Sequence, residues 1–334
     1  MDPYAVVVLI PVFNDWIAAS MLLDQLDGVL SGKGLRVRVL LIDDGSTESV
    51  GDAFDALRLN AIDDIQLLSL RRNFGHQRAI AIGLAYLESE LPCDAVVIMD
   101  GDGEDDPADI PRLIERCRAL GNTKIVFAER TRRVDSHTFR AFYACYRAAH
   151  WVLTGVKVRV GNFSVIPWQV LRKLVTVSEL WNHYAAAVYA AKLPRDSIET
   201  SRRPRLHGQS KMNFGSLVGH GLSAMSVHGE ALAVRLLFGS LIVGFGFFVG
   251  LALLAGAMAG GYRTASTSVT IVGAVFALGL SAELVGMALV LALRTLQGRA
   301  ASGFLPLRDY KFYIDTVAPL RVRADSAPHG MRVS

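Results

Sequence analysis

Two long apolar segments near the carboxyl end set the strongest limit on how this chain can fold. The first runs from Leu236 to Met258 and the second from Val269 to Leu293, and Glu283 is the one charged residue within them. A helix needs about 20 mostly apolar residues to cross the hydrocarbon core of a bilayer. We therefore predict a transmembrane helical hairpin at 233–295, where the apolar excess of this 51% apolar chain is concentrated.

The charges beside the hairpin predict its orientation. Basic residues flank its outer ends, and one lies in the turn between the two helices: Arg235, Arg294, Arg299, Arg308 and Lys311 outside, Arg263 in the turn. Loops rich in lysine and arginine stay in the cytoplasm, and the amino terminus does not resemble a signal peptide. We therefore expect an integral protein of the cytoplasmic membrane, with its large amino-terminal domain and its tail at 296–334 in the cytoplasm.

The first 130 residues alternate strand-like apolar runs with helical patterns. The strand-like runs lie at 5–10, 37–42, 65–70, 95–100 and 124–129, and helical patterns at 17–30 and 80–91 separate some of them. Such alternation predicts an α/β fold, a mostly parallel Rossmann-like sheet with helices on both faces. We place this α/β domain at 1–210 and expect an interfacial amphipathic helix at 211–232 before the hairpin.

Carboxylates follow the fourth predicted strand, at the sheet edge where α/β proteins bind ligands. Asp100 and Asp102 flank Gly101, and Glu104 comes two residues later. Carboxylate oxygens suit Mg²⁺ or Mn²⁺, which proteins hold by one or two carboxylates together with substrate phosphates. The sequence predicts a metal site here, with Glu104 as a third ligand, although Asp and Gly are also ordinary turn residues.

A second acidic pair, Asp43 and Asp44, ends the second predicted strand. We expect the segment 43–47 to open a helix, with Ser46 or Thr47 as its cap and one carboxylate facing a base or ribose. A cap alone would not explain two acids at the edge that also carries Asp100 and Asp102.

The segment 195–211 is basic and lies shortly before the first apolar run. It contains Arg203, Arg205, Ser210 and Lys211. Arginine and lysine are the natural partners of phosphate oxygens, so we predict phosphate binding near a membrane rather than nucleic-acid binding. A solvated basic face beside the bilayer is the alternative.

Taken together, these motifs resemble those of family 2 glycosyltransferases of the GT-A fold. The matching segments are Pro11-Val12-Phe13-Asn14-Asp15, Asp43-Asp44-Gly45-Ser46 and Asp100-Gly101-Asp102. The segment Arg72–Gln77 and the two apolar runs are similar to those of the polyprenyl-phosphate group, which includes dolichyl-phosphate mannose synthases. The resemblance implies inverting transfer of a sugar from a UDP- or GDP-sugar to a polyprenyl phosphate at the cytoplasmic face.

The resemblance also implies roles for individual residues. The nucleotide-sugar would be bound by Pro11, Val12, Asn14, Asp15, Asp43, Asp44, Gly75, His76, Asp100, Gly101, Asp102 and Arg130. The metal would be held by Asp100, Asp102 and Glu104. The acceptor phosphate would be bound by Arg203, Arg205, Ser210 and Lys211, and catalysis assigned to Asp100, Asp102, Arg130, Arg203 and Lys211.

The sequence departs from the family pattern at three residues, and the segment 304–314 after the second apolar run also differs from the common ending of the group. Phe13 replaces the usual Tyr, Glu104 the usual Gln, and Asn162 stands where related enzymes often carry Asp. These differences bear on metal preference and on the sugar.

Other functions fit part of the sequence. A haloacid-dehalogenase-type phosphatase would use Asp100 as nucleophile, but this leaves Asp43 and Asp44 unexplained. A glycosyltransferase with another membrane acceptor, a processive polysaccharide synthase and a catalytically inactive scaffold are further alternatives. Small residues such as Gly244, Gly246 and Gly250 in the first apolar run permit close helix packing, which is compatible with a homo-oligomer.

Overall fold

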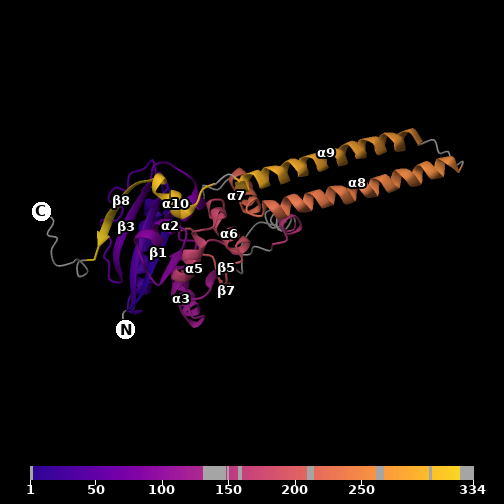
Figure 1. Ribbon diagram of the computed structural model, residues 1–334. Helices are drawn as coiled ribbons and strands as arrows, with labels where there is room; N and C mark the ends of the chain where they lie inside the picture. Colours follow the sequence, from indigo (N-terminus) through magenta and orange to yellow (C-terminus); the bar gives the residue numbers. More distant parts are fainter. Residues whose placement is uncertain are drawn as a thin grey trace. The chain divides into compact units, whose positions relative to one another are not determined.

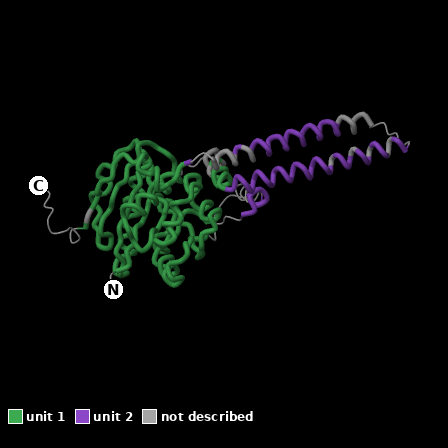
Figure 2. Tube along the Cα trace, viewed as in Figure 1, with its two compact units in different colours: residues 1–136, 158–227, 304–334 green, residues 137–157, 228–303 purple. Residues whose placement is uncertain are grey.

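A computed structural model describes residues 3–130, 148, 150–156, 160–208, 214–260, 267–300 and 303–323. The chain divides into two compact units, shown in Figure 2. The first comprises Met1–Ser136, Val158–Val227 and Phe304–Ser334, and the second His137–Lys157 and His228–Gly303. The first unit includes segments on both sides of the apolar hairpin, and the domain limits given above stay a prediction.

An eight-stranded sheet forms the centre of the first unit (Figure 1). Its strands are β1 (Tyr4–Val12), β2 (Leu35–Asp43), β3 (Ile62–Leu70), β4 (Ala95–Ile98), β5 (Ile125–Arg130), β6 (Ser164–Pro167), β7 (Arg195–Thr200) and β8 (Ile314–Val322), in the order β7-β5-β6-β4-β1-β2-β3-β8. β6 and β8 run antiparallel to their neighbours and the other six share one direction. The predicted mostly parallel sheet is confirmed, and its polar strand ends lie along one edge.

Strand β1 shows why these segments form a buried sheet. Its sequence YAVVVLIPV is rich in β-branched residues, which favour strands. Val7 and Leu9 pack into the core on one face, whereas Val6 and Val8 pack into the core on the other. A strand buried on both faces reads as a continuous apolar run, and this is the pattern that predicted it.

Helices cover both faces of this sheet. The helices of the first unit are α1 (Trp16–Leu30), α2 (His76–Glu90), α3 (Ile110–Ala119), α5 (Trp168–Leu174), α6 (Tyr184–Ala190), α7 (Phe214–Ser226) and α10 (Pro306–Asp309), with 3-10 turns η1 (Pro107–Asp109), η2 (Ser178–Trp181) and η3 (Tyr310–Tyr313). α1 and α3 contribute to one core layer, and α2, α5 and α6 to the other. The predicted two-sided coverage is confirmed.

The segment after the hairpin contains a strand that the sequence analysis did not predict. β8 pairs antiparallel with β3, with Leu67 opposite Ala318 and Ser69 opposite Thr316. β8 contains Pro319, a residue that sheets accept at an edge strand, where its missing N–H is not needed. This segment is therefore part of the catalytic sheet.

The prediction that 43–47 opens a helix is wrong. Residues 44–61 form bends and turns. The Asp43 side chain accepts the N–H of Ser46 at 2.8 Å, and Gly45 has a φ of +69°. A side-chain turn of this kind competes with helix formation, and a left-handed residue interrupts a right-handed helix.

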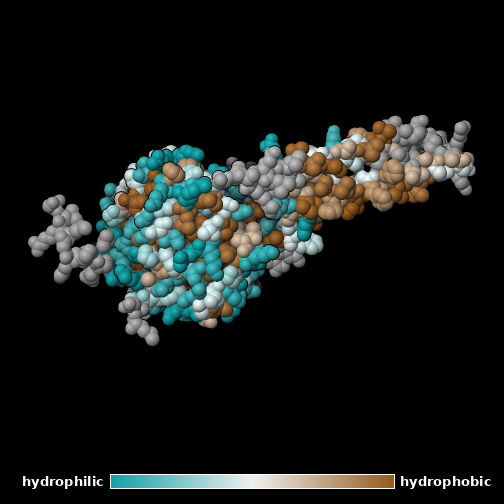
Figure 3. Space-filling model, in the orientation of Figure 1, coloured by the Kyte–Doolittle hydropathy of each residue, from teal (hydrophilic) through white to brown (hydrophobic). Residues whose placement is uncertain are grey.

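The second unit contains the two apolar helices α8 (Gly229–Ala259) and α9 (Thr267–Ala300), which pack against each other (Figure 1). Gly229–Gly250 and Gly273–Leu291 are long and apolar enough to cross a membrane. Large apolar side chains such as Phe245 (70% exposed) and Phe276 (73% exposed) face outward, and the apolar surface of this unit is visible in Figure 3. The two predicted helices are confirmed as helices of membrane-spanning length and composition.

The predicted interfacial segment is helical as α7. Ala224 near its carboxyl end and Val227 just after it are buried against Ala186 of α6, whereas Leu222 is 59% exposed. One side of α7 is thus attached to the catalytic unit. Its position at a membrane surface stays a prediction.

Candidate active site

The carboxyl ends of β4, β1 and β2 lie side by side and bring the acidic motifs together. The N–H of Asp44 donates to the carbonyl of Val12 at 2.9 Å, and a Cβ on Gly101 would lie 3.1 Å from the carbonyl oxygen of Pro11. Pro11, Val12 and Gly101 are buried and form the floor of this edge. Predicted site residues from three strands are therefore adjacent.

Asn14 connects the end of β1 to the loop after β2. Its Oδ1 accepts the N–H groups of Thr47 at 2.8 Å and Glu48 at 3.0 Å, and its own N–H donates to the Ser46 hydroxyl at 2.9 Å. Asn14 has a φ of +51°, a region that asparagine tolerates better than most residues. Asn14 thus shapes the loop that follows Asp43.

Asp44 connects the same loop to the start of α2. Its carboxylate is 3% exposed and accepts the N–H groups of Phe74 at 2.7 Å and Gly75 at 2.9 Å. Burial raises the pKa of Asp44 above its ordinary value, although the two N–H donors act in the opposite direction. The Asp44 carboxylate therefore fixes the loop after β2 to the residues that precede α2. Asp43 is the more exposed acid of the pair.

Gly45 allows these two loops to approach closely, so Gly45→Ala is expected to lower the free energy of unfolding by more than about 2 kcal/mol. A Cβ at this position would lie 2.4 Å from the carbonyl carbon of Arg72 and 2.5 Å from the backbone nitrogen of Asn73. Thermal unfolding in detergent measures the effect. Gly51→Ala is the matched control, because Gly51 also has a positive φ but its nearest neighbouring atom is 4.0 Å away. Equal losses from both variants would contradict a role for close packing.

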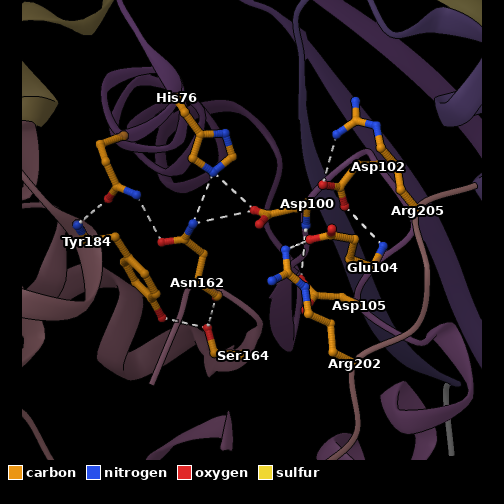
Figure 4. Close-up of polar contacts among 11 residues, drawn as sticks. His76, Asp100, Asp102, Glu104, Asp105, Asn162, Ser164, Tyr184, Arg202 and Arg205 are labelled. Atoms are coloured by element: carbon orange, nitrogen blue, oxygen red, sulfur yellow. Dashed lines mark hydrogen bonds and ion pairs between the residues drawn. The ribbon is translucent and has the colours of Figure 1, made fainter. Parts of the chain in front are cut away.

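Arg205 joins the basic segment to the acidic edge. Its guanidinium lies 3.3 Å from Oδ2 of Asp102 and pairs with the carboxylate of Asp15, as Figure 4 shows for Asp102. The Arg205 side chain is only 15% exposed. A residue predicted to bind the acceptor phosphate therefore contacts two residues predicted to bind the donor.

Backbone hydrogen bonds hold the basic segment in this place. The N–H of Leu206 donates to the carbonyl of Asp102 at 3.0 Å, and the N–H of Arg203 to the carbonyl of Glu104 at 2.9 Å. Gly103 between them has a φ of +76°, and a Cβ there would lie 2.3 Å from the Leu206 side chain. The two segments run alongside each other because position 103 carries no side chain.

Two further arginines of the segment, Arg202 and Arg203, face different acids. Arg203 contacts Asp106 at 3.2 Å and Gln25 at 3.1 Å. Arg202 pairs with Glu104. In this arrangement Arg205, rather than Arg203, lies at the Asp100-Gly101-Asp102 motif.

Asp100 meets a second group of polar residues from α2 and the segment before β6 (Figure 4). His76 Nε2 lies 3.0 Å from Asp100 Oδ1, and Asn162 Nδ2 lies 3.4 Å from the same oxygen. Desolvation opposes a charge on His76, but the carboxylates of Asp100, Asp102 and Asp44 together outweigh this effect and raise the pKa of the imidazole above its ordinary value. His76 is therefore a neighbour of the predicted metal site.

The donor set fits a divalent cation only if a substrate supplies further oxygens. Within the described residues, no three His, Cys, Asp or Glu side chains are arranged to hold a metal by themselves. Asp100 and Asp102 supply carboxylate oxygens on one short loop, and Mg²⁺ and Mn²⁺ are commonly held by such pairs together with phosphate oxygens and water. Glu104 is engaged by Arg202, so its role as third ligand stays a prediction.

Sequence comparison decides the family. Residues 7–175, which include both acidic motifs and Asn162, match the family described as glycosyl transferase family 2. The chain belongs to this family. It is a glycosyltransferase, and the resemblance drawn from its motifs is confirmed.

Two relatives and one solved structure illustrate the similarity. An undecaprenyl-phosphate 4-deoxy-4-formamido-L-arabinose transferase of Edwardsiella ictaluri is 26% identical over 85% of this chain and 86% of its own length. The uncharacterized glycosyltransferase YkcC of Bacillus subtilis is 25% identical over 61% of this chain and 62% of its own length. The glucosyl-3-phosphoglycerate synthase of Mycobacterium tuberculosis, crystallised with Mn²⁺, UDP-glucose and phosphoglyceric acid, has a TM-score of 0.45 at 14% identity, covering 70% of this chain and 79% of that one.

Three predicted residues of this glycosyltransferase have no described side-chain position. Arg130 ends β5 opposite Thr200 of β7, and the structure describes its backbone only. Ser210 and Lys211 lie outside the described residues. Their proposed roles in phosphate binding stay predictions.

The sequence analysis missed the residues that surround Asp100 and Glu104. Gln77, Ser164 and Tyr184 form a buried polar group with Asn162, and Arg202 pairs with Glu104. Arg202 was visible as part of a basic segment, but its partner lies almost a hundred residues away. Buried polar residues without a charge leave no pattern that could have found the others.

Proposed function

We propose that this glycosyltransferase moves a sugar from a UDP- or GDP-linked donor to a polyprenyl phosphate, with inversion at the anomeric carbon. The observation that carries the proposal is the contact of Arg205 with Asp15 and Asp102. It joins a segment suited to phosphate binding to the acidic edge suited to a metal-bound diphosphate. Donor and acceptor phosphates can therefore be bound at one place.

The donor half of the site has a clear chemical logic. Asp100 and Asp102 would hold Mg²⁺ or Mn²⁺ against the donor diphosphate, where the cation would act as a Lewis acid and neutralise the leaving group. His76 and Asn162 contact the Asp100 carboxylate, and the backbone N–H of Glu104 donates to Asp102 Oδ1 at 3.0 Å. These contacts hold the carboxylates in place before the donor arrives.

The acceptor half needs a phosphate-binding group rather than a strong base. A phosphate monoester has a second pKa of about 6, so it is already a nucleophilic anion near neutral pH. Arg205 can leave its carboxylates and pair with phosphate oxygens in two-point contacts. Direct attack of that phosphate on the sugar from the side opposite the leaving group gives inversion.

The pairing of β3 with β8 supports a membrane topology in which both ends of the hairpin lie on the same side of the bilayer. β3 lies before the apolar hairpin in sequence and β8 after it, yet they are hydrogen-bonded neighbours. If α8 and α9 both cross the bilayer, the chain returns to the side from which it left. Arg235 in α8 and Arg294 in α9 flank the two apolar runs, and these basic residues favour the cytoplasm as that side.

The relative from Edwardsiella supports a lipid-phosphate acceptor. Its name specifies undecaprenyl phosphate, and the similarity extends over 293 residues. An alignment of that length reaches beyond the family match at 7–175. Which sugar is transferred here is left to experiment.

A donor screen tests the proposal. Purified protein in detergent is incubated with undecaprenyl phosphate and labelled UDP- or GDP-sugars, with Mn²⁺, with Mg²⁺ or with EDTA. We expect one donor to give a labelled lipid in the presence of metal, and EDTA to abolish the product. Failure with every donor despite metal-dependent nucleotide binding would contradict the lipid-phosphate acceptor and favour another membrane acceptor.

A further inference from the structure

Asn162 is connected by its side chain to the predicted metal site and by a polar chain to the start of α6. Gln77 and Asn162 are each 8% exposed, and Tyr184 is fully buried. The backbone N–H of Tyr184 donates to Gln77 Oε1 at 2.7 Å, and Gln77 Nε2 donates to Asn162 Oδ1 at 3.0 Å. Asn162 Nδ2 then faces His76 Nε2 at 3.0 Å and Asp100 Oδ1 at 3.4 Å (Figure 4).

The direction of every bond in this chain follows from its first member. A backbone N–H can only donate, so Gln77 must present its oxygen to Tyr184 and its NH₂ group to Asn162. Asn162 must in turn present its oxygen to Gln77 and its NH₂ group to Asp100 and His76. The orientation of both amides is set from the Tyr184 N–H and does not depend on His76. Asn162 Nδ2 can donate to Asp100 Oδ1 in either protonation state of the imidazole, and to His76 Nε2 only when that nitrogen carries no proton.

The backbone of Asn162 is also connected to Tyr184, through the hydroxyl of Ser164. The Ser164 hydroxyl donates to the Asn162 carbonyl at 2.9 Å and lies 2.7 Å from the Tyr184 hydroxyl. Ser164 has one hydroxyl hydrogen, which it uses for Asn162, so Tyr184 donates to Ser164. Both ends of Asn162 are thus connected to Tyr184.

We propose that Asn162 is a positioning residue that orients the Asp100 carboxylate for metal and donor binding, and that Gln77 acts on Asp100 through Asn162. The proposal rests on the donor half of the proposed function and is independent of the acceptor. Residues that orient a metal-binding side chain typically contribute about 10- to 100-fold to metal affinity. The same range is expected here for the affinity of Mn²⁺ with UDP or GDP.

Two nearly isosteric substitutions test the order of the chain. Asn162→Leu removes the donor to Asp100, and Gln77→Met removes the group that orients Asn162 without removing a contact to Asp100. We expect each to weaken Mn²⁺-nucleotide binding, measured by titration calorimetry, with the larger loss of about 10- to 100-fold for Asn162→Leu. The double variant should bind no more weakly than Asn162→Leu alone, because Gln77 has no separate route to the metal.

Controls separate positioning from folding. Gln169→Met removes an exposed amide on α5 that contacts the carbonyl of Asn122, and should leave affinity unchanged. Thermal unfolding of each variant shows whether it is folded. Unchanged affinity in either single variant would overturn the proposal. So would a double variant whose loss of affinity equals the product of the two single losses.

A failure of the proposed function gives a different result. If the wild-type protein binds nucleotide with metal but transfers no sugar, the acceptor assignment fails and the affinity test above still applies. If it binds no Mn²⁺-nucleotide at all, the donor assignment fails and this metal-positioning proposal is overturned with it. In that case thermal unfolding of the wild type, the two single variants and the double variant still shows whether Gln77 and Asn162 are coupled. For hydrogen-bonded partners, the losses in the free energy of unfolding are not additive.

Discussion

Asp102→Asn is expected to lower the rate of sugar transfer by about 100-fold or more at saturating donor and metal, because the site loses one of its two motif carboxylates. The asparagine oxygen can still accept the N–H of Glu104, which now bonds to Asp102 Oδ1 at 3.0 Å. The loop should therefore keep its shape while its charge changes. Initial rates of lipid-linked sugar formation measure the effect.

The matched control for this charge change is Asp52→Asn, at an exposed turn residue outside the site. It should transfer sugar at the wild-type rate. An Asp102→Asn enzyme whose rate stays within about threefold of wild type would remove this carboxylate from the mechanism.

Arg205→Ala is expected to have opposite effects on catalysis and on metal binding. The rate of sugar transfer should fall by about 100-fold, because the phosphates lose one preorganised hydrogen-bonding side chain. Affinity for Mn²⁺ alone should rise, because Asp15 and Asp102 lose the cation that now pairs with both. Transfer assays and Mn²⁺ titration without nucleotide measure the two effects.

Arg203→Ala provides the comparison. Arg203 contacts Asp106 and Gln25 rather than Asp102, so its removal should leave Mn²⁺ affinity at the wild-type value. Arg205→Lys should retain only part of the activity, because a lysine offers one point of charge where arginine makes two directed contacts. A loss of Mn²⁺ affinity in Arg205→Ala would show that Arg205 supports the metal site instead of competing for it.

The strands and the acidic edge could be predicted because their signals are local. β4 and most of β1 are buried on both faces and read as apolar runs, and β2 does so from Val39 to Ile42. The acids at their carboxyl ends are adjacent because parallel strands end at the same edge. This reasoning located Asp43 and Asp100 without knowledge of any contact between them.

Other parts of the site depend on contacts between distant segments. Arg202, Arg203 and Arg205 are close together in sequence, and nothing local determines which of them meets which acid. Their partners were selected by the backbone pairing of 203–206 with 102–104, which the small size of Gly103 permits. β8 was missed for a related reason, since its Pro319 is unusual in a strand and is accommodated because β8 is at the edge.

The central claim is that the acceptor is a lipid phosphate. The most direct measurement compares undecaprenyl phosphate with undecaprenol, which lacks the phosphate, using the donor found in the screen and mass spectrometry of the product. We predict a glycosyl phosphodiester from undecaprenyl phosphate and no product from undecaprenol. Equal glycosylation of undecaprenol would contradict the account, because the sugar would then be transferred to a hydroxyl group and the phosphate would not be the nucleophile.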